Sequence, residues 1–185
     1  MDTRVVAGVD VKSTGIQAVV RPSGEQWNAN VDDPGMSKTA DVLSSIQPEI
    51  IVMESQGGIE LPVAGILATA GLPLAFVSRR NVRDFARSIG RIREDENHAA
   101  LLAYFAQLIR PEVRAIPTDL LEHLKALKTR KEEILSILAQ ERSRQETNPT
   151  PVQRDIRNHI YFLEKSAFAL GEEINRAVRS SSIWR

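Results

Sequence analysis

The sequence predicts an α/β fold in which a mixed sheet flanked by helices is followed by a long antiparallel helical hairpin. Three observations predict it. Short apolar segments of β type recur near the N-terminus, separated by turn residues. Apolar strands then alternate with helical patterns as far as Ile109. Beyond Pro117 the pattern changes to two long tracks with apolar residues at heptad spacing, which is typical of paired helices.

The first strand is expected over residues 5–9, an apolar run that ends at Asp10. A second strand is expected over 15–20 and a third over 26–31, with Arg-Pro-Ser-Gly at 21–24 as the turn between them. Consecutive strands joined by such short turns favour an antiparallel meander.

A buried strand is expected over residues 50–53, because a continuous apolar run indicates a strand covered on both faces. It ends at Glu54. The helix before it is expected over 37–46, capped by Ser37. The elements that follow in order are a helix at 59–70, a strand at 74–77, and helices at 81–89 and 97–109.

The segment after Pro117 predicts a helical arm. The first track is interrupted by Lys131 and otherwise consists of Leu120, Leu124, Leu127, Ile134 and Leu138. After a proline hinge at 148–151, the second track consists of Ile156, Ile160, Leu163, Ala167, Leu170 and Ile174. We therefore divide the chain into a domain at 1–116 and an arm at 117–185. The apolar seam is narrow, so we expect a homodimer or higher homo-oligomer formed through the arm.

Composition limits the class of protein. An apolar fraction of 42% with 26% charged residues indicates a folded chain, and zero cysteines exclude disulfides and thiolate metal sites. No apolar run reaches the roughly 18–20 residues that a membrane span needs, so we expect no membrane partner and a cytoplasmic protein. Basic and acidic residues are equal at 24 each, so net charge does not indicate a nucleic-acid partner.

Local charge is more informative than net charge. Residues 79–93 form a basic segment that contains six arginines and one acid, Asp84. The acidic cluster 94–96 follows it directly. Arginines beside an acidic cluster can hold phosphate next to a bound metal ion, so we predict that the segment binds nucleic acid. Its candidate residues are Arg79, Arg80, Arg83, Arg87 and Arg91. The alternative is a solvated helix face with its counter-charges.

Three acids are candidates for a metal site. Asp10 and Glu54 each end an apolar strand, and Asp95 stands before the helix expected from residue 97. If the first and fourth strands are neighbours, the two strand-end carboxylates converge on one edge of the sheet. An all-oxygen site of this kind favours Mg²⁺ or Mn²⁺. The alternative for Asp10 is a turn or cap residue, and for Asp95 an N-cap.

Three stretches resemble a known family in order and spacing: "GVDVKSTGIQAVV", "IVMESQGGIELPVAGILATAGLPLAFVSRRNVRDFARSIGR" and "HAALLAYFA". They are similar to the N-terminal half of DEDD-type insertion-sequence transposases, which are associated with a bridge RNA and related to pilin-gene invertases. The resemblance extends to the terminal "SSSIWR". It implies an RNase H-like (RuvC-like) fold in a prokaryotic mobile element, with four acids that bind Mg²⁺ for cleavage and exchange of DNA strands.

The resemblance implies roles for individual residues. Asp10, Glu54 and Asp95 match the first three acids, whereas His98 occupies the place of the fourth, an Asp in the family. A gap before Asp95 gives this alignment; without the gap, Glu96 and Ala99 take the last two places. We prefer the gapped alignment, because Asp95 and His98 at i,i+3 share a helical face and imidazole can bind Mn²⁺ or Mg²⁺. His98 is then a fourth ligand or a general base, or else it caps or packs in a degraded site.

Three functions follow from these patterns. The first is metal-dependent phosphoryl transfer on DNA in transposition or inversion, and the second is a nucleic-acid-binding or dimerisation module without catalysis. The third, an ATPase of the sugar- or acetate-kinase type, is disfavoured because no Gly-rich phosphate loop follows the second strand. The family continues into a C-terminal domain with a catalytic serine. That domain would begin where this sequence stops, so we expect a fragment, a shortened relative or a module that works with a partner.

Overall fold

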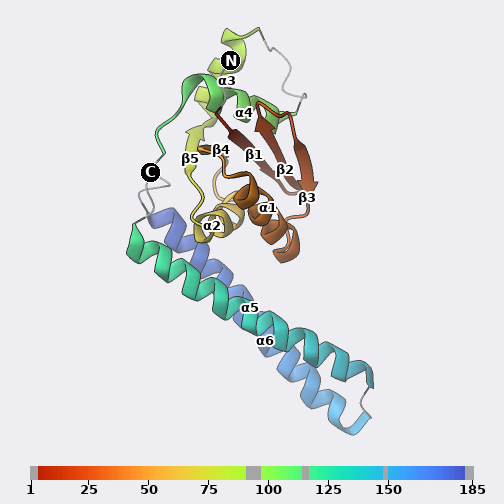
Figure 1. The fold of residues 1–185 in the computed structure, drawn as a ribbon. Coiled ribbons are helices and arrows are strands. Elements are labelled where there is room, and N and C mark those ends of the chain that lie inside the picture. The colour runs from red at the N-terminus through yellow and green to blue at the C-terminus, as the bar shows by residue number, and fades with distance from the viewer. Residues whose placement is uncertain (1–3, 91–96, 114–116, 148–149, 182–185) are drawn as a thin grey trace.

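A computed structural model describes residues 4–90, 97–113, 117–147 and 150–181 (Figure 1). The strands are β1 (Val6–Lys12), β2 (Gly15–Arg21), β3 (Gln26–Ala29), β4 (Ile50–Ser55) and β5 (Leu74–Ser78). The helices of the domain are α1 (Asp33–Ile46), α2 (Leu61–Thr69), α3 (Arg79–Ser88) and α4 (His98–Ile109). The arm consists of α5 (Thr118–Thr147) and α6 (Thr150–Ser180).

The strands form one mixed sheet in the order β3-β2-β1-β4-β5. The meander of β1, β2 and β3 is antiparallel, whereas β4 pairs parallel with both β1 and β5. The first and fourth strands are therefore neighbours, as the site prediction requires. This order and these directions confirm the predicted RNase H-like arrangement.

Helices cover both faces of the sheet. On one face, alternate residues of β1 such as Ala7 and Val9 pack with α1, α2 and the base of the arm. On the other face, Val6 and Val52 pack with α3 and α4. Burial on both sides explains why β1 and β4 appear in the sequence as continuous apolar runs rather than as alternating ones.

Several predicted boundaries were wrong by a few residues. β1 continues through Asp10 to Lys12, and β4 continues through Glu54 to Ser55, so the two acids lie within strands rather than after them. Helix α1 starts at Asp33 rather than at Ser37. The cap is Asp32, whose carboxylate accepts a hydrogen bond from the backbone N of Gly35 at 2.8 Å.

The arm is an antiparallel hairpin whose base packs on α2 and whose tip lies far from the sheet (Figure 1). Leu124 of α5 and both Ile174 and Val178 of α6 belong to the same core cluster as the sheet. Farther out, the seam is closed by Ile134, Leu138, Leu163 and Ala167. The prediction of an apolar heptad seam is confirmed for these residues. The division into two domains stays a prediction, since base and sheet share one core.

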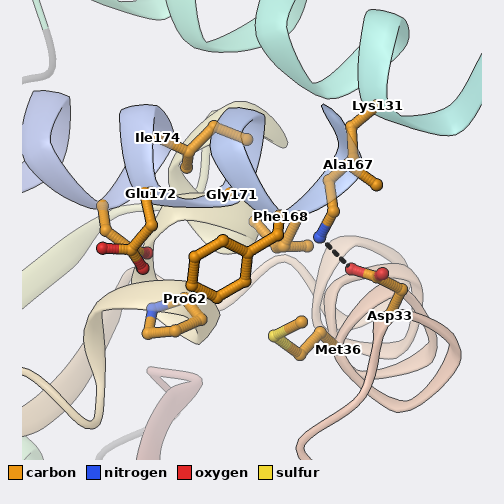
Figure 2. Close-up of a pocket in the computed structure, with 11 residues that line it drawn as sticks. Asp33, Met36, Pro62, Lys131, Ala167, Phe168, Gly171, Glu172 and Ile174 are labelled. Carbon is orange, nitrogen blue, oxygen red and sulfur yellow. Dashed lines mark hydrogen bonds and ion pairs between the residues drawn. The ribbon is translucent and has the colours of Figure 1, made fainter. Parts of the chain in front are cut away.

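Lys131, which interrupts the first apolar track, attaches the arm to the domain. Its Nζ lies 2.5 Å from Oδ1 of Asp33, at the start of α1 (Figure 2). The Lys131 ammonium passes Gly171 of α6, where an added Cβ would come within 3.8 Å of it. Beside this ion pair is a pocket of about 290 Å³ between α1, α2 and α6, which Met36, Pro62 and Phe168 help to line. The interruption in the heptad pattern is thus a specific contact.

Candidate metal and nucleic-acid site

Strands β1 and β4 place Asp10 and Glu54 side by side. The parallel register pairs Gly8 with Val52 and Val9 with Met53, and Asp10 and Glu54 are the next residue of each strand. Side chains alternate along a strand, so both carboxylates point to the face that α4 covers. Asp10 is only 2% exposed and Glu54 4%. Two buried carboxylates on adjacent strands repel one another unless cations neutralise them.

Glu54 is contacted by two basic side chains from different helices. His98 Nε2, at the first residue of α4, donates to Glu54 Oε2 at 2.5 Å. Arg79 Nε, at the first residue of α3, lies 3.6 Å from Glu54 Oε1. Both helices therefore begin at the site. Their N-termini add positive partial charge near the carboxylates.

The position of α4 depends on Gly8. A Cβ at this residue would lie 2.2 Å from the carbonyl O of Ala99 and 2.3 Å from the backbone N of Ala103. The helix backbone thus rests directly on β1. Asn97 fixes the start of the helix: its Oδ1 accepts from the backbone N of Ala100 at 3.0 Å, and its Nδ2 donates to Gln26 Oε1 on β3. These contacts bring His98 to Glu54.

Asp10 has different partners from Glu54. Lys12 Nζ lies 3.2 Å from Asp10 Oδ2, and Gln56 Nε2 donates to Asp10 Oδ1 at 3.1 Å. Beside Asp10 lies an open hollow of about 360 Å³ on the strands β1, β2 and β3, to which Gln17 and Asn28 contribute amide groups. The buried carboxylate is therefore part of the lining of a polar, open depression.

The structure brings together some of the predicted site residues and not others. Asp10, Glu54 and His98 form one group, in which the negative charge of Asp10 acts on His98. Asp95 and Arg91 lie outside the described residues, so their roles stay predictions. Of the arginines on α3, Arg79 reaches the site, whereas Arg80 and Arg87 pair with Asp84 at 3.7 Å and 3.6 Å. Arg83 is exposed on the same helix.

Asp10 and Glu54 fit a divalent metal ion by their chemistry. Carboxylate oxygens are the ligands that Mg²⁺ and Mn²⁺ prefer, and here two of them are buried at the same level of one sheet. Within the described ranges, no group of three or more His, Asp or Glu side chains is placed to hold a metal. A complete ligand set therefore needs at least one further group besides these two acids. Asp95, three residues before the first residue of α4, is the candidate from sequence.

Three functional candidates were missed in the sequence: Lys12, Gln56 and Glu60. Lys12 could have been found, because it lies two residues after Asp10 in a strand that continues and so shares its face. Gln56 lies just past the end of β4, where side-chain direction depends on the loop. Glu60 is 1% exposed and accepts hydrogen bonds from the backbone of the loop that carries Gln56. In the sequence, the sign of its importance was an acid placed immediately before an apolar helix.

The pair His98–Glu54 makes stability depend on pH. The hydrogen bond to Glu54 raises the pKa of His98 above 6.5, burial opposes this, and the negative charge of Asp10 reinforces it. A raised pKa in the folded state means that the stabilisation is full below pH 6.5 and is lost as pH rises through the native pKa. In chelator-treated protein, we expect the unfolding free energy of wild type to exceed that of His98→Gln most below pH 6.5.

Urea unfolding at a series of pH values measures that difference. His123→Gln, which removes an exposed imidazole from α5, is the matched control. A wild-type advantage over His98→Gln that stays constant from acid to alkaline pH would show that the imidazolium does not stabilise the fold.

The described residues include no helix that is both long and apolar enough to span a membrane. No protein-family model and no curated protein matches the sequence. Among solved structures, the chain is similar to T. thermophilus RuvC in complex with Holliday junction substrate, with 16% identity and a TM-score of 0.38. That similarity covers 66% of this chain and 88% of the RuvC chain.

Proposed function

We propose that this chain is the divalent-metal-dependent phosphoryl-transfer domain of a DNA transposase or recombinase. The observation that carries the proposal is the pair of buried carboxylates, Asp10 and Glu54, at the same level of adjacent parallel strands. Burial of two like charges is costly, and a functional site is the ordinary reason to retain it. The stretches that resemble DEDD-type transposases run through the same strands.

In this proposal Asp10 and Glu54 hold Mg²⁺ or Mn²⁺, with Asp95 and His98 completing the ligand set. The bound ion supplies Lewis acidity at a phosphodiester and promotes ionisation of the attacking water or hydroxyl. His98 has to release the proton that it shares with Glu54 before its nitrogen can act as a ligand or a base. Lys12 and Arg79 place positive charge beside the acids, where a phosphate would lie.

The wider assignments are also proposals. The substrate is DNA, a structured guide RNA is a further partner, and 1–116 is the catalytic domain. Homo-oligomerisation through the arm is supported by Tyr161, Phe162 and Phe168, which are 61%, 64% and 71% exposed on α6. Light scattering of the full chain at tens of micromolar decides this last point, since a monomer would contradict it.

A second function is favoured by the partners of Glu54. Its two oxygens are contacted by Arg79 and by His98, a histidine whose pKa is raised, as expected for a site in which protein charges have replaced a metal. The chain would then bind nucleic acid or a second copy and cleave nothing.

Two measurements on the wild-type chain separate these functions. Calorimetric titration should show Mn²⁺ binding with release of a proton, and branched or donor-end DNA should be nicked only when Mn²⁺ or Mg²⁺ is present. DNA binding without nicking on any substrate leaves the module function standing. Failure to bind Mn²⁺ contradicts the assignment of Asp10 and Glu54 as ligands.

The exposed arginines of α3 are expected to bind phosphate. Each phosphate contact changes the slope of log K against log salt by about 0.9 for duplex DNA. We therefore expect Arg83→Gln to flatten the slope by about 0.9. Arg130→Gln removes an exposed arginine from the arm, where it pairs with Glu133, and is the matched control. Fluorescence anisotropy over a salt series measures the slope for each variant. Equal slopes for Arg83→Gln and Arg130→Gln would exclude a specific phosphate contact by Arg83.

A further inference from the structure

The loop between β4 and α2 is folded around the buried acid Glu60. One carboxylate oxygen accepts a hydrogen bond from the backbone N of Gln56 at 2.7 Å, and the other accepts from the backbone N of Gly58 at 3.0 Å. Hydrogen bonds to an ionised carboxylate are roughly twice as strong as neutral ones. Glu60 therefore fixes the path of the chain from Gln56 to Glu60 itself.

This loop carries a side chain to the candidate site. Gln56 is held by Glu60 through its backbone, and its side-chain Nε2 donates to Asp10 Oδ1 at 3.1 Å. Lys12 meets the other oxygen, Oδ2. One oxygen of Asp10 is thus oriented by β1 itself and the other by the loop. If the loop takes another path, Asp10 keeps its burial but loses the contact that sets the plane of its carboxylate.

The arm holds the same loop from outside. Arg179 Nη2, near the end of α6, donates to the carbonyl O of Gly57 at 2.9 Å. Gly57 and Gly58 have φ values of 89° and 129°, which favour glycine, and a Cβ at Gly58 would lie 2.5 Å from Arg179 Nη2. The two glycines therefore permit a backbone path that Glu60 holds through the N–H groups of Gln56 and Gly58 and Arg179 holds through the carbonyl of Gly57.

We propose that Glu60 is a positioning residue, which touches neither metal nor substrate and orients the Asp10 carboxylate through Gln56. Its effect on metal affinity rests on the proposed function, since it requires Asp10 to be a ligand. Groups that orient metal ligands are typically worth about 10- to 100-fold in affinity.

The central variant is Glu60→Gln, which keeps the size of the side chain and replaces one accepting oxygen by an NH₂ group that faces a backbone N–H. We expect it to weaken Mn²⁺ binding about tenfold by calorimetry. Gln56→Leu should weaken binding to a similar extent, and the double variant should bind no more weakly than Gln56→Leu alone. That non-additivity distinguishes positioning through Gln56 from general destabilisation.

Asp32→Asn is the matched control. Asp32 also accepts a hydrogen bond from a backbone N–H, that of Gly35, but it caps α1 away from the site. Its Mn²⁺ affinity should equal that of wild type. Additive losses in the double variant, or an equal loss in Asp32→Asn, would overturn the proposal. If Glu60→Gln fails to fold, Glu60→Asp takes its place, since its shorter side chain keeps the charge but cannot span both backbone amides.

A metal-free measurement separates this proposal from the proposed function. The side-chain amide of Gln56 gives its own signals in a nitrogen–proton NMR spectrum, identified by their absence in Gln56→Leu. In Glu60→Gln these signals should move to the position of a free glutamine amide, and in Asp32→Asn they should stay. If wild type binds no Mn²⁺ but the Gln56 signals move as expected, the positioning role stands and the metal assignment falls. Unmoved signals overturn the positioning role in every case.

Discussion

Replacing Gly8 by alanine is expected to lower the free energy of unfolding by about 1–3 kcal/mol, the range found when a packed core receives an extra methyl group. The added Cβ would lie 2.2 Å from the carbonyl O of Ala99 and 2.3 Å from the backbone N of Ala103. Both atoms belong to the backbone of α4, so a side-chain rotation cannot relieve the overlap. Either α4 or β1 has to shift. Urea denaturation measures the loss.

Gly171→Ala adds the same methyl group where it is harmless. Gly171 lies inside α6, and among the described residues an added Cβ would have only Lys131 Nζ, at 3.8 Å, within contact distance. Alanine is favoured over glycine in a helix by up to about 1 kcal/mol, so this variant should be as stable as wild type or more stable. Equal stability of Gly8→Ala and Gly171→Ala would show that β1 and α4 are not in close contact.

The Gly8 variant should also disturb the site. His98 is the first residue of α4, and its contact with Glu54 depends on how closely that helix approaches β1. A displaced α4 weakens this contact and lowers the pKa of His98 toward its ordinary value. The pH dependence of stability described above should therefore be smaller in Gly8→Ala than in wild type.

The succession of strands along the chain and the two central acids could be predicted from sequence because both depend on local pattern, whereas the pairing of β1 with β4 entered the site prediction only as a condition. Apolar runs mark β1 and β4, and in each of them the run is interrupted by a single acid, Asp10 or Glu54. The strand ends were misplaced because an acid was taken to end a strand, whereas here the acids are buried within it. Parallel pairing of β1 with β4 then makes them neighbours.

The contacts that complete the site could not be predicted, because they depend on positions set by tertiary structure. Gln56 reaches Asp10 only through the loop that Glu60 folds, and no periodicity describes that loop. Lys131 looked like a defect in the heptad track, since its partner Asp33 is 98 residues away. Similarly, Arg79 was one arginine of a basic segment in the sequence, and its position directly after β5 brings it to Glu54.

Asp10→Asn and Glu54→Gln should each reduce metal-dependent DNA nicking about 10³-fold, since loss of charge stabilisation worth several kcal/mol corresponds to a factor of ten for each 1.36 kcal/mol. Amides keep the size of these buried side chains, so the fold should be retained. Affinity for DNA should change little, because the exposed arginines of α3 are untouched. Asp41→Asn, which removes an exposed acid from α1, is the control for net charge.

Asp10→Asn and Glu54→Gln should differ in how far each lowers the pKa of His98, because only Glu54 contacts that imidazole. Glu54→Gln removes the negative charge that His98 contacts at 2.5 Å, so it should lower the pKa of His98 more than Asp10→Asn, whose effect is only through charge at a distance. NMR titration of His98 in metal-free protein measures both shifts. Loss of nicking in both variants with the larger pKa change in Glu54→Gln is the expected result. Wild-type nicking rates in either variant would place the chemistry outside this pair of carboxylates, whereas an equal loss in Asp41→Asn would show that net charge alone is responsible.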